Sequence, residues 1–600
     1  MVYFRVLSFI IFVLFFLSHS VLANAAQNFK TDLSATYTIN ESDSANVVID
    51  LTLTNSSENH FPDSYQLYLS FDDVSDVKAE DGGGRIESAI EKTSKGQILN
   101  LALNKKPIGL NKKTNIKISF STKSILRRTP SAVEINIPGI SDADTFGKFD
   151  LYIKVPESFG EPSYIKPFSS DLSYSKDEIS KSGISVAFGE SQTYEYSLAY
   201  HLKNPNFYPK NVTLALPPTT NYQEIFINYI SPRPKSVILD RDGNWIAAYS
   251  LPPLSEQDVD VRGFAKVSLK PDISEISDEE KALYTKSTRF WQSDDENIKK
   301  LAQELKTPEK IYHYTVNKLN YDYDRVSKKK PRLGAVASLK NSESAVCLEF
   351  TDLFIALARS ANIPAREING FAFTNNDQAR PSSLIADVLH AWPEYYDKEK
   401  SAWIMVDPTW GNTTGGVDYF SIMDLNHIAF VIKGVRGDFP IPAGGYKSKS
   451  EEGVRDVVVN LAESTPEEVS DVDIDVSYSA SFIAGLPIKA NINIYNKGNK
   501  AILPQSLVVS SGDLTPTNQA SQIPLIPPFG KIAIEINFEN KNILTNKEAG
   551  FTIAYASEKQ EQEVKIVPFF KSVKGGVLIG VSTIIIFIIA SATRRLRLFR

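Results

Sequence analysis

Hydrophobic and polar residues alternate over much of the first 270 positions, and this two-residue period is typical of half-buried β-strands. In residues 49–54 and 116–121, for example, every apolar side chain is followed by a polar one. Further short segments of this kind are separated by Gly, Pro, Asn and Asp, as in β-sandwiches. The pattern predicts two β-rich modules, over residues 27–190 and 191–270.

The period of the apolar residues changes to that of an α-helix after these modules. In residues 298–305 apolar side chains recur every three or four positions. Thr307 followed by Pro308 indicates the start of another helix, because Thr can accept a hydrogen bond at the N-cap and Pro fits the first turn. An α-containing domain is therefore predicted over residues 271–440.

Alternation returns after an acidic and polar stretch at residues 447–471. Residues 488–494 and 532–538 carry Ile, Ala or Phe at every second position. The sequence therefore predicts an immunoglobulin-like β-sandwich over residues 470–568.

Both ends of the chain carry apolar segments. Residues 1–25 combine an early Arg, a short apolar run and small residues, which is typical of a cleaved signal peptide. The alternative is a retained membrane helix, but the run is shorter than the ~20 residues that a span needs. Residues 575–593 are uncharged and long enough to cross a membrane as one helix, whereas a buried core helix would fit such an uninterrupted apolar run poorly.

The short tail at residues 594–600 carries four Arg. Cationic residues beside a membrane helix collect on the cytoplasmic side because they resist translocation. We therefore expect a single-pass protein of the cell membrane with a cytoplasmic C-terminus. The remainder of the chain is then extracytoplasmic.

Composition narrows the classes of function. Apolar residues make up 42% and charged residues 23% of the chain, so a globular protein is expected and wholesale disorder is not. A formal net charge of -6 creates no strong field for nucleic acid, and nucleic-acid binding is not expected. One cysteine excludes an internal disulfide and every multi-cysteine metal site, and no residue pattern demands a cofactor or a metal.

Cys347 opens a segment with strong helical spacing, residues 347–361. Ser344 is the expected N-cap, which places the thiol in the first turn, where free N–H groups and the helix dipole favour a thiolate. Nearby carboxylates would oppose ionisation, so the sequence leaves the net effect open. These carboxylates belong to Glu343, Glu349 and Asp352.

His390 and Asp407 are the expected partners of the thiol, because a predicted β-hairpin lies between them. If Tyr396 faces Ser401 across the turn, His390 lies directly opposite Asp407 on one face of the sheet. A carboxylate in that place can hold the tautomer and the charge of an imidazole. Pro393 is the weak point, because it lacks an N–H group and can introduce a bulge.

Four short motifs resemble the core of the transglutaminase-like superfamily, in which Cys, His and Asp follow one another in this order. The motifs are Cys347-Leu-Glu-Phe, Asn362-Ile-Pro-Ala-Arg366, His390-Ala-Trp and Val406-Asp-Pro-Thr409. The resemblance implies a papain-like α+β fold over residues 271–440, with Cys347 as nucleophile, His390 as acid and base, and Asp407 as orienting group. The preceding β-rich segment is similar to N-terminal modules of extracytoplasmic prokaryotic members.

Two positions depart from the family pattern: Ala345 replaces a frequent Gly, and Pro393 replaces an aliphatic strand residue. By analogy the backbone N–H of Cys347 is one oxyanion donor. The second donor is expected near Tyr321, Tyr323 or Trp291. The remaining candidates are expected to be structural or exposed: His313, His427, Trp392, Trp403 and Trp410.

The sequence thus favours a membrane-anchored, extracytoplasmic thiol acyltransferase or hydrolase that forms a thioester on Cys347 with a protein or peptide substrate at the cell surface. An amine or water would then resolve the thioester, and the sequence does not choose between them. Two alternatives remain open. One is a catalytically silent surface scaffold or binding protein, and the other is a plain cysteine peptidase acting on wall peptides.

Overall fold

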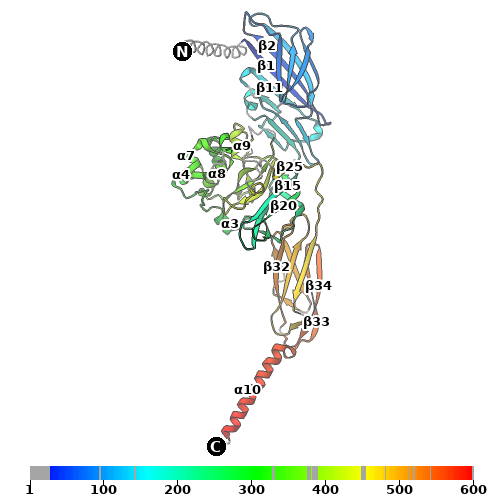
Figure 1. The fold of residues 1–600 in the computed structure, drawn as a ribbon, viewed down its shortest axis with the longest axis vertical. Helices are drawn as coiled ribbons and strands as arrows, with labels where there is room; N and C mark the ends of the chain where they lie inside the picture. The colour runs from blue at the N-terminus through cyan, green and yellow to red at the C-terminus, as the bar shows by residue number, and fades with distance from the viewer. Residues whose placement is uncertain are drawn as a thin grey trace, which may run out of the picture.

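The chain forms an elongated molecule with a β-rich region at one end, a mixed α/β region in the middle, and a β-sandwich followed by one long helix at the other end (Figure 1). This computed structural model describes residues 28–597 except 94–95, 141–142, 181, 328–330, 375–379, 382–388, 447–454, 480, 513, 518–519 and 541. The predicted signal peptide, residues 1–25, lies outside the described residues. The predicted fold class is confirmed, while the predicted domain boundaries stay predictions.

The N-terminal region is built on a seven-stranded sheet with the order β13-β11-β1-β2-β8-β4-β5. Its strands are β1 (Phe29–Ile39), β2 (Ala45–Asn55), β4 (Ser75–Asp81), β5 (Gly84–Arg85), β8 (Lys113–Thr122), β11 (Phe146–Lys154) and β13 (Ser173–Ser175). The predicted alternation is present in β2, where Ile49 and Leu51 are buried and Asp50 is exposed. One face of this sheet therefore covers a core.

Two smaller sheets complete this region, with the orders β3-β7-β6 and β12-β14-β10-β9. Their strands are β3 (Ser64–Leu69), β6 (Glu87–Thr93), β7 (Gly96–Ala102), β9 (Leu126–Arg128), β10 (Val133–Ile137), β12 (Tyr164–Lys166) and β14 (Ile184–Phe188). Short helical turns join them: η1 (Ala143–Thr145), η2 (Glu157–Phe159) and α2 (Lys176–Ile179). The sheet that contains β12 and β14 packs against the middle of the molecule, where Tyr164 and Ala187 contact Leu425.

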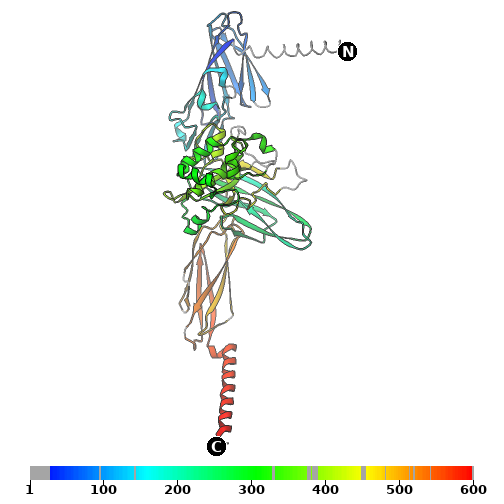
Figure 2. The ribbon, with the colours of Figure 1, turned by 90° about the vertical axis from the view of Figure 1, so that its left-hand side faces the viewer.

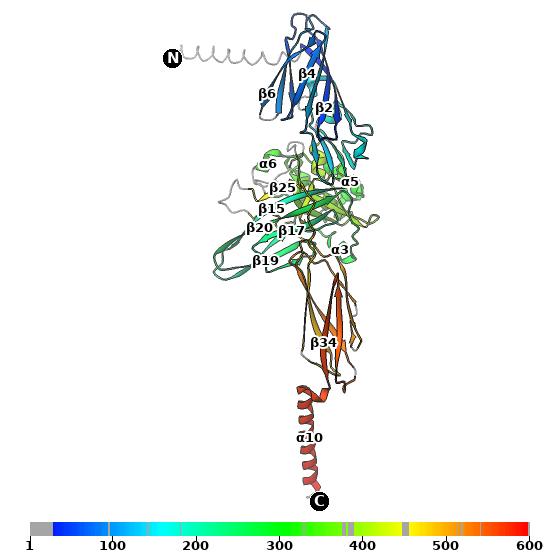
Figure 3. The ribbon, with the colours of Figure 1, turned by 90° about the vertical axis from the view of Figure 1, so that its right-hand side faces the viewer.

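Two antiparallel sheets follow, with the orders β17-β20-β15-β25 and β16-β19-β18, and they lie beside the helical part of the molecule (Figures 2 and 3). Their strands are β15 (Ser191–Asn204), β16 (Lys210–Leu216), β17 (Gln223–Ser231), β18 (Ser236–Leu239), β19 (Trp245–Leu251), β20 (Ser255–Ser268) and β25 (Val457–Leu461). Strand β25 falls inside the stretch 447–471 expected to be merely polar. It joins the sheet because Val457 and Val459 turn toward the core.

The middle region has a four-stranded sheet, β23-β22-β21-β24, with a cluster of helices against it. The helices are α3 (Asp278–Leu283), α4 (Glu296–Leu305), α5 (Pro308–Lys318), α6 (Tyr323–Ser327), α7 (Ala335–Lys340), η3 (Ser342–Ser344), α8 (Cys347–Ser360) and α9 (Pro408–Thr413), and the strands are β21 (Ala365–Ala372), β22 (His390–Asp397), β23 (Ala402–Met405) and β24 (His427–Lys433). Thr307 caps α5 as predicted. Helix α8 is buried on all sides rather than on the one face that its spacing predicts.

The C-terminal β-sandwich pairs the sheets β26-β28-β32-β30 and β27-β34-β33-β29-β31 around one apolar core. Its strands are β26 (Val472–Tyr478), β27 (Ser481–Ile483), β28 (Ile488–Asn496), β29 (Gln505–Ser511), β30 (Thr515–Pro516), β31 (Ala520–Ile523), β32 (Lys531–Glu539), β33 (Lys547–Tyr555) and β34 (Glu558–Val567), followed by η4 (Phe569–Lys571) and α10 (Val573–Arg597). Within α10, residues 573–594 are long and apolar enough to cross a membrane, and their side chains are exposed.

Buried ion pairs fix α8 in place. The Arg332 guanidinium binds Asp352 of α8 and Glu367 of β21 together, with its Nε 2.9 Å from Asp352 Oδ2. Both carboxylates are fully buried, and although Lys433 also lies 3.7 Å from Glu367, Arg332 is the cation that the two carboxylates share. Replacing one partner of such a group leaves an uncompensated charge inside the protein.

We therefore expect Arg332→Met to lower the free energy of unfolding by about 3–5 kcal/mol. Equilibrium urea unfolding of the full chain in detergent, followed by tryptophan fluorescence, measures this loss, since all five Trp lie between residues 245 and 410. Lys299→Met is the matched control, because it removes an exposed ion pair with Glu296 on α4, in the same region as the Trp residues. Equal transitions for Arg332→Met and the wild type would contradict the expectation.

Candidate active site

Cys347 is the first residue of α8, where backbone N–H groups have no partner within the helix. The N-cap is Val346, whose N–H donates to the Glu349 carboxylate at 3.1 Å. The prediction that Ser344 caps the helix is wrong, because Ser344 ends the short helix η3 and Ala345 and Val346 are extended between the two helices. The thiol still lies where the helix dipole favours an anion.

The carboxylates that the sequence placed near the thiol are mostly compensated. Glu349 forms a buried ion pair with Arg325, with 2.9 Å between Oε2 and Nη1. Asp352 pairs with Arg332, and Glu343 lies at the surface. The two buried carboxylates therefore do not oppose a thiolate as uncompensated charges.

The structure brings the three predicted site residues together. His390 Nε2 lies 2.9 Å from Asp407 Oδ2, and both side chains are fully buried. The Cys347 thiol is also buried, and it helps to raise the pKa of His390. Asp407 contacts Nε2 of His390, and Nδ1 is buried without a hydrogen-bond partner among the described residues, so Nδ1 is the ring nitrogen available to the thiol.

The hairpin that carries His390 has a different register from the predicted one. Tyr396 faces Trp403 rather than Ser401, and the ladder between β22 and β23 ends at Glu394. Pro393 has no N–H to continue the ladder, although its carbonyl accepts a hydrogen bond from Val406 N–H. His390 and Asp407 are thus not a cross-strand pair, because Asp407 lies beyond the end of β23.

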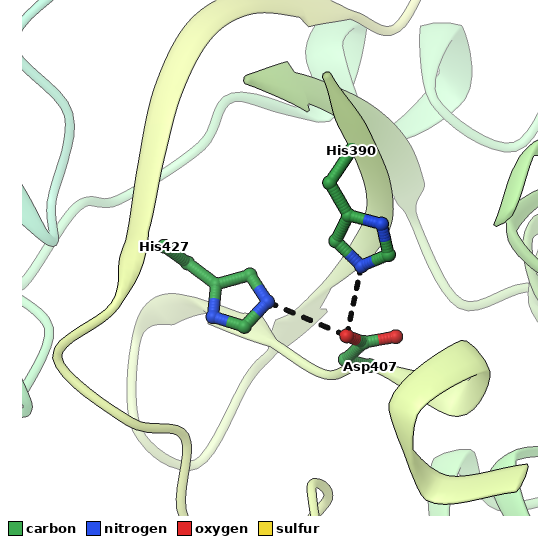
Figure 4. A group of neighbouring side chains, drawn as sticks. All are labelled: His390, Asp407 and His427. Atoms are coloured by element: carbon green, nitrogen blue, oxygen red, sulfur yellow. Dashed lines mark hydrogen bonds and ion pairs between the residues drawn. The ribbon is translucent and has the colours of Figure 1, made fainter. Parts of the chain in front are cut away.

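Asp407 reaches His390 because it is the N-cap of α9. Its Oδ1 accepts hydrogen bonds from Thr409 N–H at 2.9 Å and Trp410 N–H at 3.0 Å. Its Oδ2 faces the opposite way and contacts His390 at 2.9 Å and His427 at 3.3 Å (Figure 4). One carboxylate therefore links a helix start to two imidazoles.

No local sequence pattern identifies His427 as a neighbour of Asp407. His427 was expected to be structural or exposed, but it is buried beside Asp407, and its Nδ1 lies 2.8 Å from Asp424 Oδ1. The sequence carries one weak signal, an Asp three residues before a His that opens an apolar strand. His313 is exposed on α5, as expected.

Burial and charge act in opposite directions on these groups. Burial alone would lower the pKa of His390, but the charge and hydrogen bond of Asp407, helped by Cys347, raise it to about 10. Burial likewise opposes protonation of His427, while Asp424 and Asp407 raise its pKa. Burial would raise the pKa of Asp407, yet His390 and His427 hold it well below its usual range.

Aromatic rings enclose the site. Trp392 and Trp410 are buried and stack on the His390 ring, with centroids 5.9 and 5.4 Å away. Trp403 packs near Tyr284 instead, with the ring centroids 5.2 Å apart. These contacts keep water away from His390 and leave the ring little freedom to turn.

His390, Asp407 and His427 each offer one atom that could ligate a metal ion, and these atoms lie within 4.8 Å of one another. A ligating imidazole nitrogen must be unprotonated. The raised pKa values favour the protonated form of both histidines, and Nε2 of each lies within hydrogen-bond distance of Asp407 Oδ2, at 2.9 and 3.3 Å. Among the described residues this cluster therefore fits a hydrogen-bonded arrangement better than a resident metal site.

We expect Asp407→Asn to lower the pKa of His390 from about 10 to below about 6.5, because burial then acts without the opposing charge. A raised pKa stabilises the fold fully below about pH 6.5, and this stabilisation is lost as pH rises through about 10. NMR of histidine-labelled protein over this range measures the titration. The control is Asp258→Asn, which changes a carboxylate beside the remote His201 and is expected to leave the His390 titration unchanged. A His390 titration that Asp407→Asn leaves unchanged would show that Asp407 does not hold its charge.

A comparison with protein-family models finds a match in the α+β region. Residues 294–408 match the sequence model of the transglutaminase-like superfamily. No curated protein matches the chain.

Several solved structures are similar at low identity. A candidate cysteine protease from Cytophaga hutchinsonii is 15% identical, covering 46% of this chain and 87% of its own, with a TM-score of 0.30. Leukotriene A4 hydrolase from Saccharomyces cerevisiae is 17% identical over 28% of this chain and 30% of its own, with a TM-score of 0.20. An M1 zinc metallopeptidase from Deinococcus radiodurans is 12% identical over 28% of this chain and 43% of its own, with a TM-score of 0.17. The family comparison thus finds residues 294–408, less than half of the chain, similar to the transglutaminase-like superfamily.

Proposed function

We propose that the protein is a thiol enzyme in which Cys347, His390 and Asp407 act as a catalytic triad on carboxamide or peptide carbonyl groups. The observation that carries the proposal is the buried His390–Asp407 pair beside the single thiol at the start of α8. A thiolate and an imidazolium held together without water are the reactants that acyl transfer requires. The family match over residues 294–408 supports the same chemistry.

The reaction proceeds in two steps. The Cys347 thiolate attacks the carbonyl carbon, His390 gives its proton to the leaving nitrogen, and the C–N bond breaks to leave a thioester. Water or an amine then attacks the thioester, His390 takes the proton, and the C–S bond breaks. Asp407 stays ionised and keeps the proton-carrying nitrogen of His390 in place throughout.

The negative oxygen that forms in each step needs donors. The backbone N–H of Cys347, in the first turn of α8, supplies one. Tyr321 lies near this point, because its backbone pairs with Ala345. Trp291 packs on the side chain of Arg359. Arg359 lies about 18 Å along α8 from Cys347, so Trp291 is not the second donor.

We also propose that α10 anchors the enzyme in the cell membrane, with the basic tail at residues 594–600 in the cytoplasm and the core outside. The exposed apolar surface of residues 573–594 supports the anchor, and the four Arg after it support the orientation. The C-terminal sandwich, residues 470–568, then separates the catalytic region from the membrane. The substrates are proteins or peptides at the cell surface.

The first test uses the fact that the chain has one cysteine. A thiol without a charged partner has a pKa of about 8.5 and is mostly protonated at about pH 6.5. We expect thiolate absorbance at this pH that disappears in Cys347→Ser and in His390→Ala, because each variant removes one half of the ion pair. Difference ultraviolet spectra of the full chain in detergent measure it.

The matched control for this test is His313→Ala, which removes an exposed histidine from the same domain. Absence of the thiolate signal in folded wild-type protein would overturn the triad and favour the silent scaffold. Incorporation of a labelled amine into surface proteins then separates transfer from hydrolysis. If peptide bonds are cut in a Cys347-dependent way and no labelled product forms, the activity is hydrolysis and not transfer.

The anchor has its own test. We expect deletion of residues 573–600 to move the protein from the membrane fraction to the soluble fraction, because no hydrophobic span then remains after the sandwich. Fractionation of cells that express either form measures the change. Retention of the shortened protein in membranes after a salt wash would contradict anchoring by α10.

A further inference from the structure

The Asp407 carboxylate has a second imidazole partner that the acyl-transfer steps do not use. His427 Nε2 lies 3.3 Å from Asp407 Oδ2, the same oxygen that contacts His390 (Figure 4). His390 approaches this oxygen from β22, and His427 approaches it from β24. His427 is buried, so its contact with the carboxylate is not weakened by water.

His427 is itself held in place from behind. Its Nδ1 lies 2.8 Å from Asp424 Oδ1, and the same oxygen accepts the N–H of Asn426 at 2.9 Å. The imidazole thus spans two carboxylates and cannot turn without losing a contact at one end. Asp424, His427, Asp407 and His390 form one buried hydrogen-bonded chain.

The segment that carries Asp424 is held by hydrogen bonds from the N-terminal region and from β15. The Asn426 amide donates to Glu134 of β10 at 3.2 Å, and the Tyr164 hydroxyl of β12 donates to the same oxygen at 2.7 Å. Tyr194 of β15 donates to the Leu425 carbonyl at 2.9 Å. The polar groups in these contacts are buried, so removing one leaves another without its partner.

A second contact from the N-terminal region reaches the backbone beside Asp407. The ammonium group of Lys166, at the end of β12, donates to the carbonyls of Asp418 and Ile422, the latter at 2.8 Å. It also lies 4.0 Å from the centre of the Tyr419 ring. The carbonyl of Tyr419 accepts the N–H of Asp407 at 3.1 Å, so Lys166 fixes the turn that holds this backbone.

We propose that His427, oriented by Asp424, is a positioning residue for the Asp407 carboxylate, and that the N-terminal β region seats this pair through Lys166 and Glu134. The inference rests on the proposed function of Cys347, His390 and Asp407. Oδ1 of Asp407 is held by the N-terminal N–H groups of α9, and Oδ2 is held by His427. With both oxygens fixed, the carboxylate presents one direction to His390, and His390 presents one direction to the thiol.

The N-terminal region is then part of the catalytic unit rather than a separate binding module. Lys166 is buried, and burial lowers its pKa to about 8 although Asp424 and Asp418 oppose this. Placing an ammonium group there is unfavourable unless its contacts are specific. The seat is therefore a dedicated contact between the two regions.

The test of the positioning role compares His427→Phe with His427→Gln in the full chain. We expect His427→Phe to lower Cys347-dependent amine incorporation or hydrolysis about 100-fold, because a small displacement of reacting groups has an effect of this size. The amide of His427→Gln can still donate to Asp407 and restores a large part of the rate. His201→Phe is the matched control, because His201 also lies between two carboxylates, those of Asp258 and Asp456, away from the site.

The test separates this inference from the proposed function. If the wild type shows neither thiolate absorbance nor Cys347-dependent turnover, the proposed function fails. If the wild type is active and a folded His427→Phe variant keeps the wild-type rate, the positioning role is overturned. If His427→Phe does not fold, a folded His427→Gln variant without activity overturns the role, because its donor to Asp407 is present.

Lys166→Met tests the seat. We expect a loss of turnover of about 10-fold in folded protein, since the turn beside Asp407 is released while the triad residues are intact. Lys500→Met is the control, because Lys500 is also partly buried between carboxylates, those of Glu224 and Glu468, but lies away from the site. Its folded form is expected to keep the wild-type turnover. A folded Lys166→Met variant with wild-type turnover would overturn the seat.

Discussion

The negative charge of Asp407 lies where water cannot reach it, and the surrounding structure is arranged to compensate it. Two N–H groups at the start of α9 hold one oxygen, and the imidazoles of His390 and His427 hold the other. An unpaired carboxylate in such a place would take up a proton and lose its partners. Because the four hydrogen bonds come from three separate elements, the position of each element is tied to this single charge.

The helix that carries Cys347 depends on compensation of the same kind. Helix α8 is buried on all sides, so its charged residues have no route to solvent. Arg325 and Arg332, which precede the helix in the chain, return to pair with Glu349 and Asp352. Buried pairs of this kind contribute little net stability but fix one arrangement, since every alternative leaves a charge alone. The same constraint fixes where the Cys347 thiol lies relative to His390.

Local sequence patterns predicted the strands and helices whose formation depends on neighbouring residues. Alternation identified β2, helical spacing identified α8, and the order Cys347, His390, Asp407 identified the residues that the fold brings together. The pairing of Tyr396 with Trp403 was missed, because the Asp397 side chain accepts N–H bonds inside the turn and moves the register. His427 was missed because its partners lie on other elements, and no local pattern encodes a contact made only in three dimensions.

Contacts between residues far apart in the chain connect the N-terminal region to the site. Asn426 and Glu134 are 292 positions apart, and Lys166 and Asp418 are 252 positions apart. Closing so long a loop has an entropic cost, so contacts of this separation depend on other contacts between the same regions. Cys347, His390 and Asp407 all lie on elements of the middle region, whereas Lys166 and Glu134 come from the N-terminal region. Because Lys166 holds the turn whose Tyr419 carbonyl accepts the Asp407 N–H, the position of Asp407 depends on contacts from both regions.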